Sequence, residues 1–147
     1  MRSSDAERAL TAESDGARRI MVRGQRDVER ARHEARTMAL DMGFADADAE
    51  RVALATTELA TNLVRYAQQG ELLVSAIVGD ARGTGIEIES RDLGPGIPDI
   101  AQALAEGFST GGGLGGGLAG VGRLMDEMKL DSEVGRGTTV TVRKWRR

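Results

Sequence analysis

The chain has 147 residues, a formal net charge of −3, one histidine and no cysteine. This length suits one domain that buries its core without cross-links, and the composition excludes disulfides, thiolate metal sites and a transition-metal cluster. The mild acidity disfavours a nucleic-acid partner, and without an apolar run of bilayer length or a secretory apolar segment we expect a cytoplasmic protein with no membrane partner.

Residues 1–16 are polar without a sustained period, so we predict a flexible N-terminal tail before a single domain at 17–147. Residues 18–23 are a short strand candidate. Asp27 is a good N-cap, and the residues after it follow the spacing of one helical face until Gly43: Val28, Ala31, Ala35, Met38, Ala39 and Met42. His33 lies opposite this stripe. Beside Glu34 it resembles a phosphoacceptor, but no second helix completes such a site, so we expect an exposed residue without a function.

A second helix is predicted to begin at Asp46, with acidic residues in its first turn. Its buried stripe is expected to hold Val52, Ala55, Leu59, Leu63 and Tyr66. Glu58 and Asn62 have i, i+4 spacing and stand together on one flank of that stripe. Taken alone, this pair is typical of a polar helix shoulder.

Two strands with a loop between them follow, at residues 72–78 and 86–92, with the loop at 79–85. The second strand alternates strictly, so Ile86, Ile88, Ser90 and Asp92 share one face, which is expected to be covered. A carboxylate on a covered face is costly unless a donor meets it. Asp92 is therefore a candidate functional residue.

The C-terminal third predicts a helix from Pro98, a glycine run at 111–117 and a further helix from Leu118. The first of these helices would bury Ile100, Leu104 and Phe108, and the second would use Leu118, Val121, Leu124, Met125 and Met128. Strands are expected at 128–134 and 138–142, and the basic run at 143–147 is expected to be a solvated strand end. This order predicts an α+β two-layer sandwich, with helices on one face of a mostly antiparallel sheet.

Eleven of the twenty glycines lie between Asp92 and Gly122, which points to a backbone that approaches a phosphate-bearing ligand closely. A P-loop is excluded because the chain has no Gly-Lys pair. The spacing Gly111-x-Gly113-x-x-Gly116 matches a dinucleotide fingerprint, but a helix precedes it where that motif needs a strand. A glycine loop that leads into a helix N-terminus at Leu118 is a sufficient anion site without lysine.

Four motifs occur in the order and approximate spacing of the four boxes of the GHKL ATPase/kinase superfamily. These motifs are Glu58-x-x-x-Asn62, Asp92-x-Gly94-x-Gly96, the run from Gly113 to Leu118, and Gly135-x-Gly137-Thr138. Within that superfamily the chain most resembles the small anti-sigma-type serine/threonine kinases, especially the switch kinases of the bacterial stressosome. The resemblance runs from about residue 18 to the end and implies the Bergerat ATP-binding fold.

The resemblance implies ATP and Mg²⁺ as cofactors. It makes Asp92 the acceptor for the adenine amino group, with Gly96 leaving room for the base and Thr138 completing the pocket. Asn62 would ligate Mg²⁺ and Glu58 would act as the catalytic base. The remaining cofactor-binding positions implied are Gly94, Gly113, Gly115, Gly116, Gly117, Leu118 and Gly137. The glycine run would close over the phosphates as a lid, although Ala119 stands where the family often has proline.

By the same resemblance the substrate would be a serine or threonine of a STAS-domain antagonist protein, and the freed kinase would activate a metal-dependent serine phosphatase in a stress response. An alternative is an anti-sigma factor that sequesters a sigma subunit and phosphorylates an anti-anti-sigma factor. A histidine-kinase catalytic module is a third, although it lacks the phosphoacceptor hairpin. Whether the chain forms a homodimer is left open.

Overall fold

The computed structural model describes residues 17–67, 70–92, 117–133 and 137–147. Its elements in chain order are β1 (Arg18–Val22), α2 (Gln25–Asp41), α3 (Asp46–Tyr66), β2 (Gly70–Asp80), β3 (Gly83–Asp92), α5 (Gly117–Leu124), β4 (Glu127–Glu133) and β5 (Gly137–Trp145). The helix predicted from Pro98 and the tail at 1–16 lie outside the described residues. The observed elements confirm the predicted α+β class.

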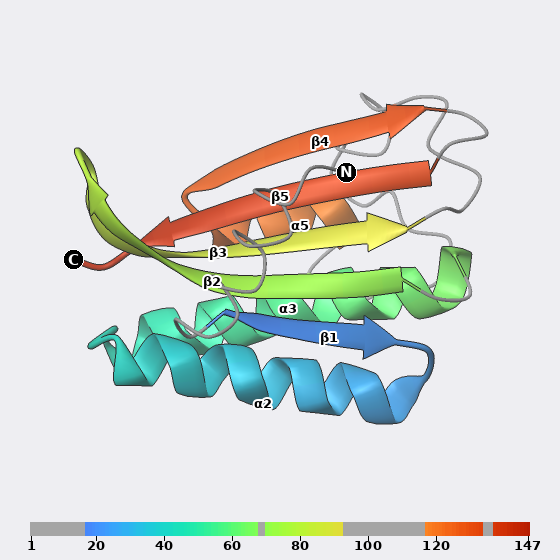
Figure 1. Ribbon diagram of the computed structural model, residues 1–147, viewed down its shortest axis with the longest axis horizontal. Coiled ribbons are helices and arrows are strands. Elements are labelled where there is room, and N and C mark those ends of the chain that lie inside the picture. Colours follow the sequence, from blue (N-terminus) through green and yellow to red (C-terminus); the bar gives the residue numbers. More distant parts are fainter. Residues whose placement is uncertain (1–16, 68–69, 93–116, 134–136) are drawn as a thin grey trace, which may run out of the picture.

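The five strands form one sheet with the order β1-β2-β3-β5-β4, and every neighbouring pair is antiparallel. Helix α3 packs against α2 on one side and against α5 on the other. Figure 1 shows α3 and α5 together behind the strands, so the described helices form one layer against one face of the sheet. The predicted two-layer arrangement is confirmed.

The core lies between these layers and follows the two periods seen in the sequence. The helical stripe of α3 is buried as expected, with Val52, Ala55, Leu59 and Leu63 at most 2% exposed. In β3, Ile86, Ile88 and Ser90 alternate with the more exposed Glu87 and Glu89. Because successive strand residues point to opposite faces, the covered face is the one that carries the isoleucines.

Several boundaries differ from the prediction. Helix α2 begins two residues before Asp27, whose carboxylate accepts a hydrogen bond from the Arg23 N–H at 2.9 Å. The β2–β3 turn is tighter than the expected loop, because the strands pair as far as Asp80 and Gly83. Helix α5 ends at Leu124 and Met128 belongs to β4, so the helical stripe predicted to reach Met128 was too long. Local sequence propensity defines the ends of helices and strands only to within one or two residues. The contacts that each end makes in the fold decide where it lies.

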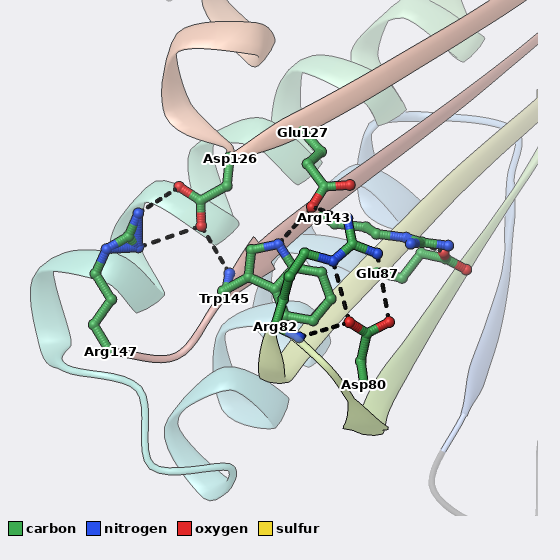
Figure 2. Close-up of polar contacts among 8 residues, drawn as sticks. All are labelled: Asp80, Arg82, Glu87, Asp126, Glu127, Arg143, Trp145 and Arg147. Atoms are coloured by element: carbon green, nitrogen blue, oxygen red, sulfur yellow. Dashed lines mark hydrogen bonds and ion pairs between the residues drawn. The ribbon is translucent and has the colours of Figure 1, made fainter.

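The expectation of a solvated basic C-terminus is correct for Arg146 and Arg147, which are exposed, but wrong for Lys144 and Trp145. Strand β5 continues to Trp145, and Lys144 and Trp145 are 5% and 8% exposed. Figure 2 shows why the tryptophan is covered: its indole N–H donates to Glu127 at 2.6 Å, and the Arg82 guanidinium stacks over its ring with 4.7 Å to the centroid. Arg147 closes the cluster through an ion pair with Asp126 at 3.0 Å.

Lys144 joins three elements inside the molecule. Its ammonium group donates to the Leu124 carbonyl, at the end of α5, with a distance of 2.9 Å. The carboxylates of Asp48, near the start of α3, and Asp126, just before β4, each lie 3.8 Å from the same nitrogen. A buried ammonium is tolerated only with such partners. Lys144 therefore fixes the C-terminal end of α5 against α3.

We predict that Lys144→Met lowers the free energy of unfolding by about 3 kcal/mol, because the Leu124 carbonyl and two carboxylates lose a buried cation. Urea unfolding followed by the fluorescence of Trp145, the single tryptophan, measures the change. The control is Lys129→Met, since the Lys129 side chain is 78% exposed and should contribute less than about 0.5 kcal/mol. Equal unfolding midpoints for the two variants would contradict the prediction.

Candidate functional site

A row of small and polar residues crosses the helix-facing side of the sheet at the end where β3 stops. Gly70 of β2 pairs with Asp92 of β3, and Ser132 of β4 pairs with Thr138 of β5. The β3–β5 register pairs Ser90 with Val140, so its next step along the same face sets Asp92 opposite Thr138. Along β3, the residues on the covered face change from isoleucine to serine to aspartate. The last residues on this face of the neighbouring strands are therefore polar or small.

Hydrogen bonds hold this last row. The Thr138 backbone N–H donates to Oδ1 of Asp92 at 3.3 Å. The Thr138 hydroxyl lies 2.9 Å from the Ser132 hydroxyl. Gly137, the first residue of β5, has φ +98°, a left-handed conformation that side chains rarely adopt. The carboxylate is therefore oriented by the neighbouring strand, and the donor that its covered position requires is present.

Helix α3 brings its polar pair to the flank that faces α5. The Arg36–Glu50 ion pair marks the α2 side of α3, and the contacts of Lys144 with Asp48 and Leu124 mark the α5 side. Successive residues of a helix are rotated by about 100° around its axis. By this rotation Glu58 and Asn62 lie between the side of α3 that points away from the core and the side that faces α5. Both residues therefore face toward the helix that follows the glycine run.

The C-terminal part of α3 lies beside the polar row. A Cβ atom added to Gly70 would lie 2.5 Å from a methyl group of Leu63 and 2.5 Å from the Arg91 carbonyl oxygen. Only glycine fits at this position, because α3 and β3 both approach its backbone. Leu63 follows Asn62 and Arg91 precedes Asp92, so the packing around Gly70 brings the asparagine and the aspartate to the same end of the molecule. In Figure 1 the end of β3 and the C-terminal part of α3 lie at the same edge.

Glu58 is more buried than a helix shoulder would be, with 5% of its surface exposed. Burial raises the pKa of Glu58 above its ordinary value of 4.5, and the positive charge of Arg65 offsets part of this rise. A carboxylate whose pKa is raised toward neutrality is a stronger proton acceptor when ionised. The environment of Glu58 suits a general base.

The start of α5 is the third part of the site. Gly117, its first residue, is buried and has φ +65°. The first N–H groups of a helix have no partner within the helix and favour an anion. Leu118 is also buried, so this end of α5 packs into the core and is held against α3.

The predicted site residues fall into two groups. Glu58, Asn62, Asp92, Gly117, Leu118, Gly137 and Thr138 are described, and Gly94, Gly96, Gly113, Gly115 and Gly116 lie outside the described residues. Sequence reasoning missed three neighbours of the site: Gly70, Ser132 and Arg65. A glycine at a strand start is a weak signal for Gly70, and the i+7 spacing from Glu58 could have indicated Arg65.

These residues fit a nucleotide ligand. Asp92 offers a fixed acceptor suited to an exocyclic amine, and α5 offers N–H donors suited to phosphate. Asn62 carries the amide oxygen that a hard divalent cation accepts as a ligand. Within the described ranges no group of three or more His, Cys, Asp or Glu side chains could form a metal site of its own. A cation held at Asn62 would take its other ligands from phosphate and water.

The comparison of the sequence with protein families agrees with this geometry. Residues 23–144 match the histidine kinase-like ATPase domain. The chain belongs to this family. The predicted family is thereby confirmed, and membership of an ATPase domain family implies the use of ATP.

Curated relatives place this ATPase domain more narrowly. The serine/threonine-protein kinase RsbT of Bacillus subtilis is 42% identical over 128 residues, which are 87% of this chain and 96% of that protein. An anti-sigma F factor of a Thermoanaerobacter species is 31% identical over 96 residues, 62% of this chain and 66% of that factor. The predicted enzyme class, serine/threonine-protein kinase, is confirmed by the first relative.

Solved structures agree on the fold. The RsbU and RsbW domains of a Mycobacterium tuberculosis protein superpose with a TM-score of 0.61 at 17% identity, over 87% of this chain and 32% of that chain. Full-length ShkA in complex with AMPPNP superposes with a TM-score of 0.54 at 23% identity, over 80% of this chain and 28% of that chain. This chain thus spans less than a third of either solved chain. Among the described helices, none is long and apolar enough to cross a bilayer.

We predict that Glu58→Gln stabilises the fold at neutral and alkaline pH. Because the pKa of Glu58 is raised in the folded state, its contribution to stability is full below the unfolded pKa and is lost as pH rises through the folded pKa. Glutamine does not ionise, so the variant should have the higher free energy of unfolding at pH 8, and its advantage should shrink toward pH 4.

Urea unfolding at both pH values measures this difference. Glu50→Gln is the matched control, because the Glu50 side chain is 45% exposed and pairs with Arg36. That variant should show no gain at pH 8. A Glu58→Gln protein less stable than the wild type at pH 8 would contradict the proposed cost of burying this carboxylate.

Proposed function

We propose that this protein is a Mg-ATP-dependent serine/threonine kinase that acts as a partner-switching regulator in the cytoplasm. The observation that carries the proposal is the packing around Gly70, which sets the end of β3 beside the C-terminal part of α3. In this proposal Asp92 as the adenine acceptor, Asn62 as the metal ligand and Glu58 as the base surround one bound ligand. The 42% identity to a serine/threonine-protein kinase supports the same conclusion.

In the proposed mechanism Asp92, oriented by the Thr138 N–H, accepts a hydrogen bond from the adenine amino group. Asn62 holds Mg²⁺ through its amide oxygen, and the α5 N-terminus at Gly117 donates to the phosphates. Mg-ATP supplies the phosphoryl group.

Glu58 orients the substrate hydroxyl and takes its proton as the hydroxyl oxygen bonds to the γ-phosphorus and the bond to the ADP oxygen breaks. The products are ADP and a phosphoserine or phosphothreonine. Burial of Glu58 keeps bulk water from this carboxylate, which favours transfer to a protein hydroxyl over hydrolysis.

We propose a STAS-domain antagonist protein as the substrate and a metal-dependent serine phosphatase as the target that the released kinase activates in a general stress response. These two partners rest on the resemblance to the switch kinases. The 31% identity to an anti-sigma F factor supports a second candidate, a factor that also sequesters a sigma subunit. Co-purification with a sigma subunit from the source cell would favour that second role.

We predict that Asp92→Asn weakens ATP binding by roughly tenfold to a hundredfold, since a charge-assisted bond of about 1.5 to 3 kcal/mol is lost. The asparagine oxygen can still accept from the Thr138 N–H, so the strand pairing should persist. Isothermal titration with ATP and with GTP measures both affinity and base preference. Unchanged ATP affinity in this variant would remove Asp92 from the adenine site.

We predict that Glu58→Ala and Asn62→Ala separate the two catalytic roles. Incubation with labelled ATP and STAS-domain proteins of the same genome should give phosphoserine or phosphothreonine with the wild type. Glu58→Ala should lower the rate of phosphoryl transfer by about 10²- to 10⁴-fold with ATP affinity retained. Asn62→Ala should lower the rate and also raise the Mg²⁺ concentration that the reaction requires. Undiminished labelling by both variants would overturn the mechanism.

A further inference from the structure

Ser132 is a hydroxyl-bearing residue of the polar row that the proposed mechanism does not use. In the β4–β5 register it pairs with Thr138, so the two side chains lie on the same face of the sheet. The strand order β3-β5-β4 places Thr138 between Asp92 and Ser132. Before Ser132, this face of β4 carries Met128 and Leu130, which pack against the core. The apolar face of β4 therefore changes to serine in the row that carries the proposed adenine acceptor.

Two distances indicate the direction in which the Ser132 hydroxyl donates. Its Oγ atom lies 2.9 Å from Oγ1 of Thr138 and 3.4 Å from the Gly137 carbonyl oxygen. Hydroxyl donors prefer a separation of about 2.7 to 2.8 Å from the acceptor oxygen, so the Thr138 hydroxyl is the better acceptor. A threonine hydroxyl that accepts one hydrogen bond still has its own hydrogen to donate. With Ser132 on one side, that hydrogen is directed to the other side of Thr138, where Asp92 lies.

We propose that Ser132 is a positioning residue for base selection, because it orients the Thr138 hydroxyl as a donor beside the Asp92 acceptor. The inference rests on the proposed adenine site. The Thr138 backbone N–H already holds Oδ1 of Asp92 at 3.3 Å, so the carboxylate is fixed as well. Adenine carries an amine donor next to a ring nitrogen that accepts. An acceptor beside a donor matches this edge of the base.

The orientation of the hydroxyl matters because a hydroxyl can both donate and accept. Hypoxanthine carries a carbonyl oxygen next to a ring N–H, the reverse of the order in adenine. A Thr138 hydroxyl without a fixed direction could turn to accept from that N–H. Ser132 removes this freedom, so the wrong base leaves polar groups without partners and is rejected.

The experiment compares ATP with ITP, the triphosphate that carries hypoxanthine. Displacement of a fluorescent ATP analogue in the presence of Mg²⁺ measures both dissociation constants. In Ser132→Ala the Kd for ATP should rise about threefold to tenfold, as expected when one neutral hydrogen bond loses its orientation. The Kd for ITP should change less than about twofold, because the hydroxyl can now turn toward hypoxanthine. Equal weakening of both nucleotides, or an unchanged Kd for ATP, would overturn the role of Ser132.

Two variants serve as controls. Ser132→Thr keeps the hydroxyl and should keep the preference of the wild type for ATP over ITP. Ser75→Ala removes a half-buried serine from β2, on the face opposite to the buried Val74, and should leave both dissociation constants unchanged. If Ser132→Thr loses the preference to the same extent as Ser132→Ala, the hydroxyl is not the group that acts.

A double-mutant cycle tests whether Ser132 acts through Thr138. In a Thr138→Val background, Ser132→Ala should cause no further rise in the Kd for ATP, since the group that Ser132 orients is absent. A further rise as large as in the wild-type background would overturn the inference. A wild type that binds ATP beside an unaffected Ser132→Ala variant removes the role of Ser132 alone. A wild type that binds no ATP removes the adenine site and this inference together.

Discussion

The antiparallel register between β3 and its two neighbours is the constraint on which the rest of the site depends. It aligns Gly70, Asp92 and Thr138 in one row on the helix-facing side of the sheet. Because side chains alternate, a slip of one residue would turn Asp92 to the open face and expose Ile86 and Ile88. Hydrophobic burial along β3 thereby secures the position of a carboxylate that is itself costly to bury. The core stabilises the register, and the register positions the functional group.

Two covered charges have opposite roles in this molecule. Lys144 has a carbonyl and two carboxylates around its ammonium group, so its burial is compensated and it ties α5 to α3 and to the start of β4. Burial raises the pKa of Glu58, and the positive charge of Arg65 offsets part of this rise. The first arrangement favours stability. The second retains a carboxylate whose burial is costly, which is consistent with the catalytic role proposed for Glu58.

The two ends of the sheet therefore have different roles. The end with the β2–β3 turn is fastened by Arg82, Trp145 and the acidic residues around them (Figure 2). The opposite end carries the polar row and faces the start of α5, the helix that continues from the glycine run. Lys144 connects α5 to α3 near the far end, and this contact helps to hold the start of α5 at a constant distance from the pair Glu58–Asn62.

The sequence by itself determined the local features. The alternation at 86–92 assigned Asp92 to the covered face, and helical spacing set Glu58 and Asn62 on one flank of α3. The four motifs together predicted the family. Only the tertiary structure decided that Gly70 pairs with Asp92 and that Ser132 lies beside Thr138, because these contacts arise from strand pairings between segments apart in the chain. Non-local packing also reversed the expectation for Lys144, whose burial depends on partners in α3 and α5. On α3 it left Leu54 exposed, whereas Val52, Leu59 and Leu63 are buried. Periodicity reports which face a residue occupies, whereas its solvation depends on what the rest of the chain sets against that face.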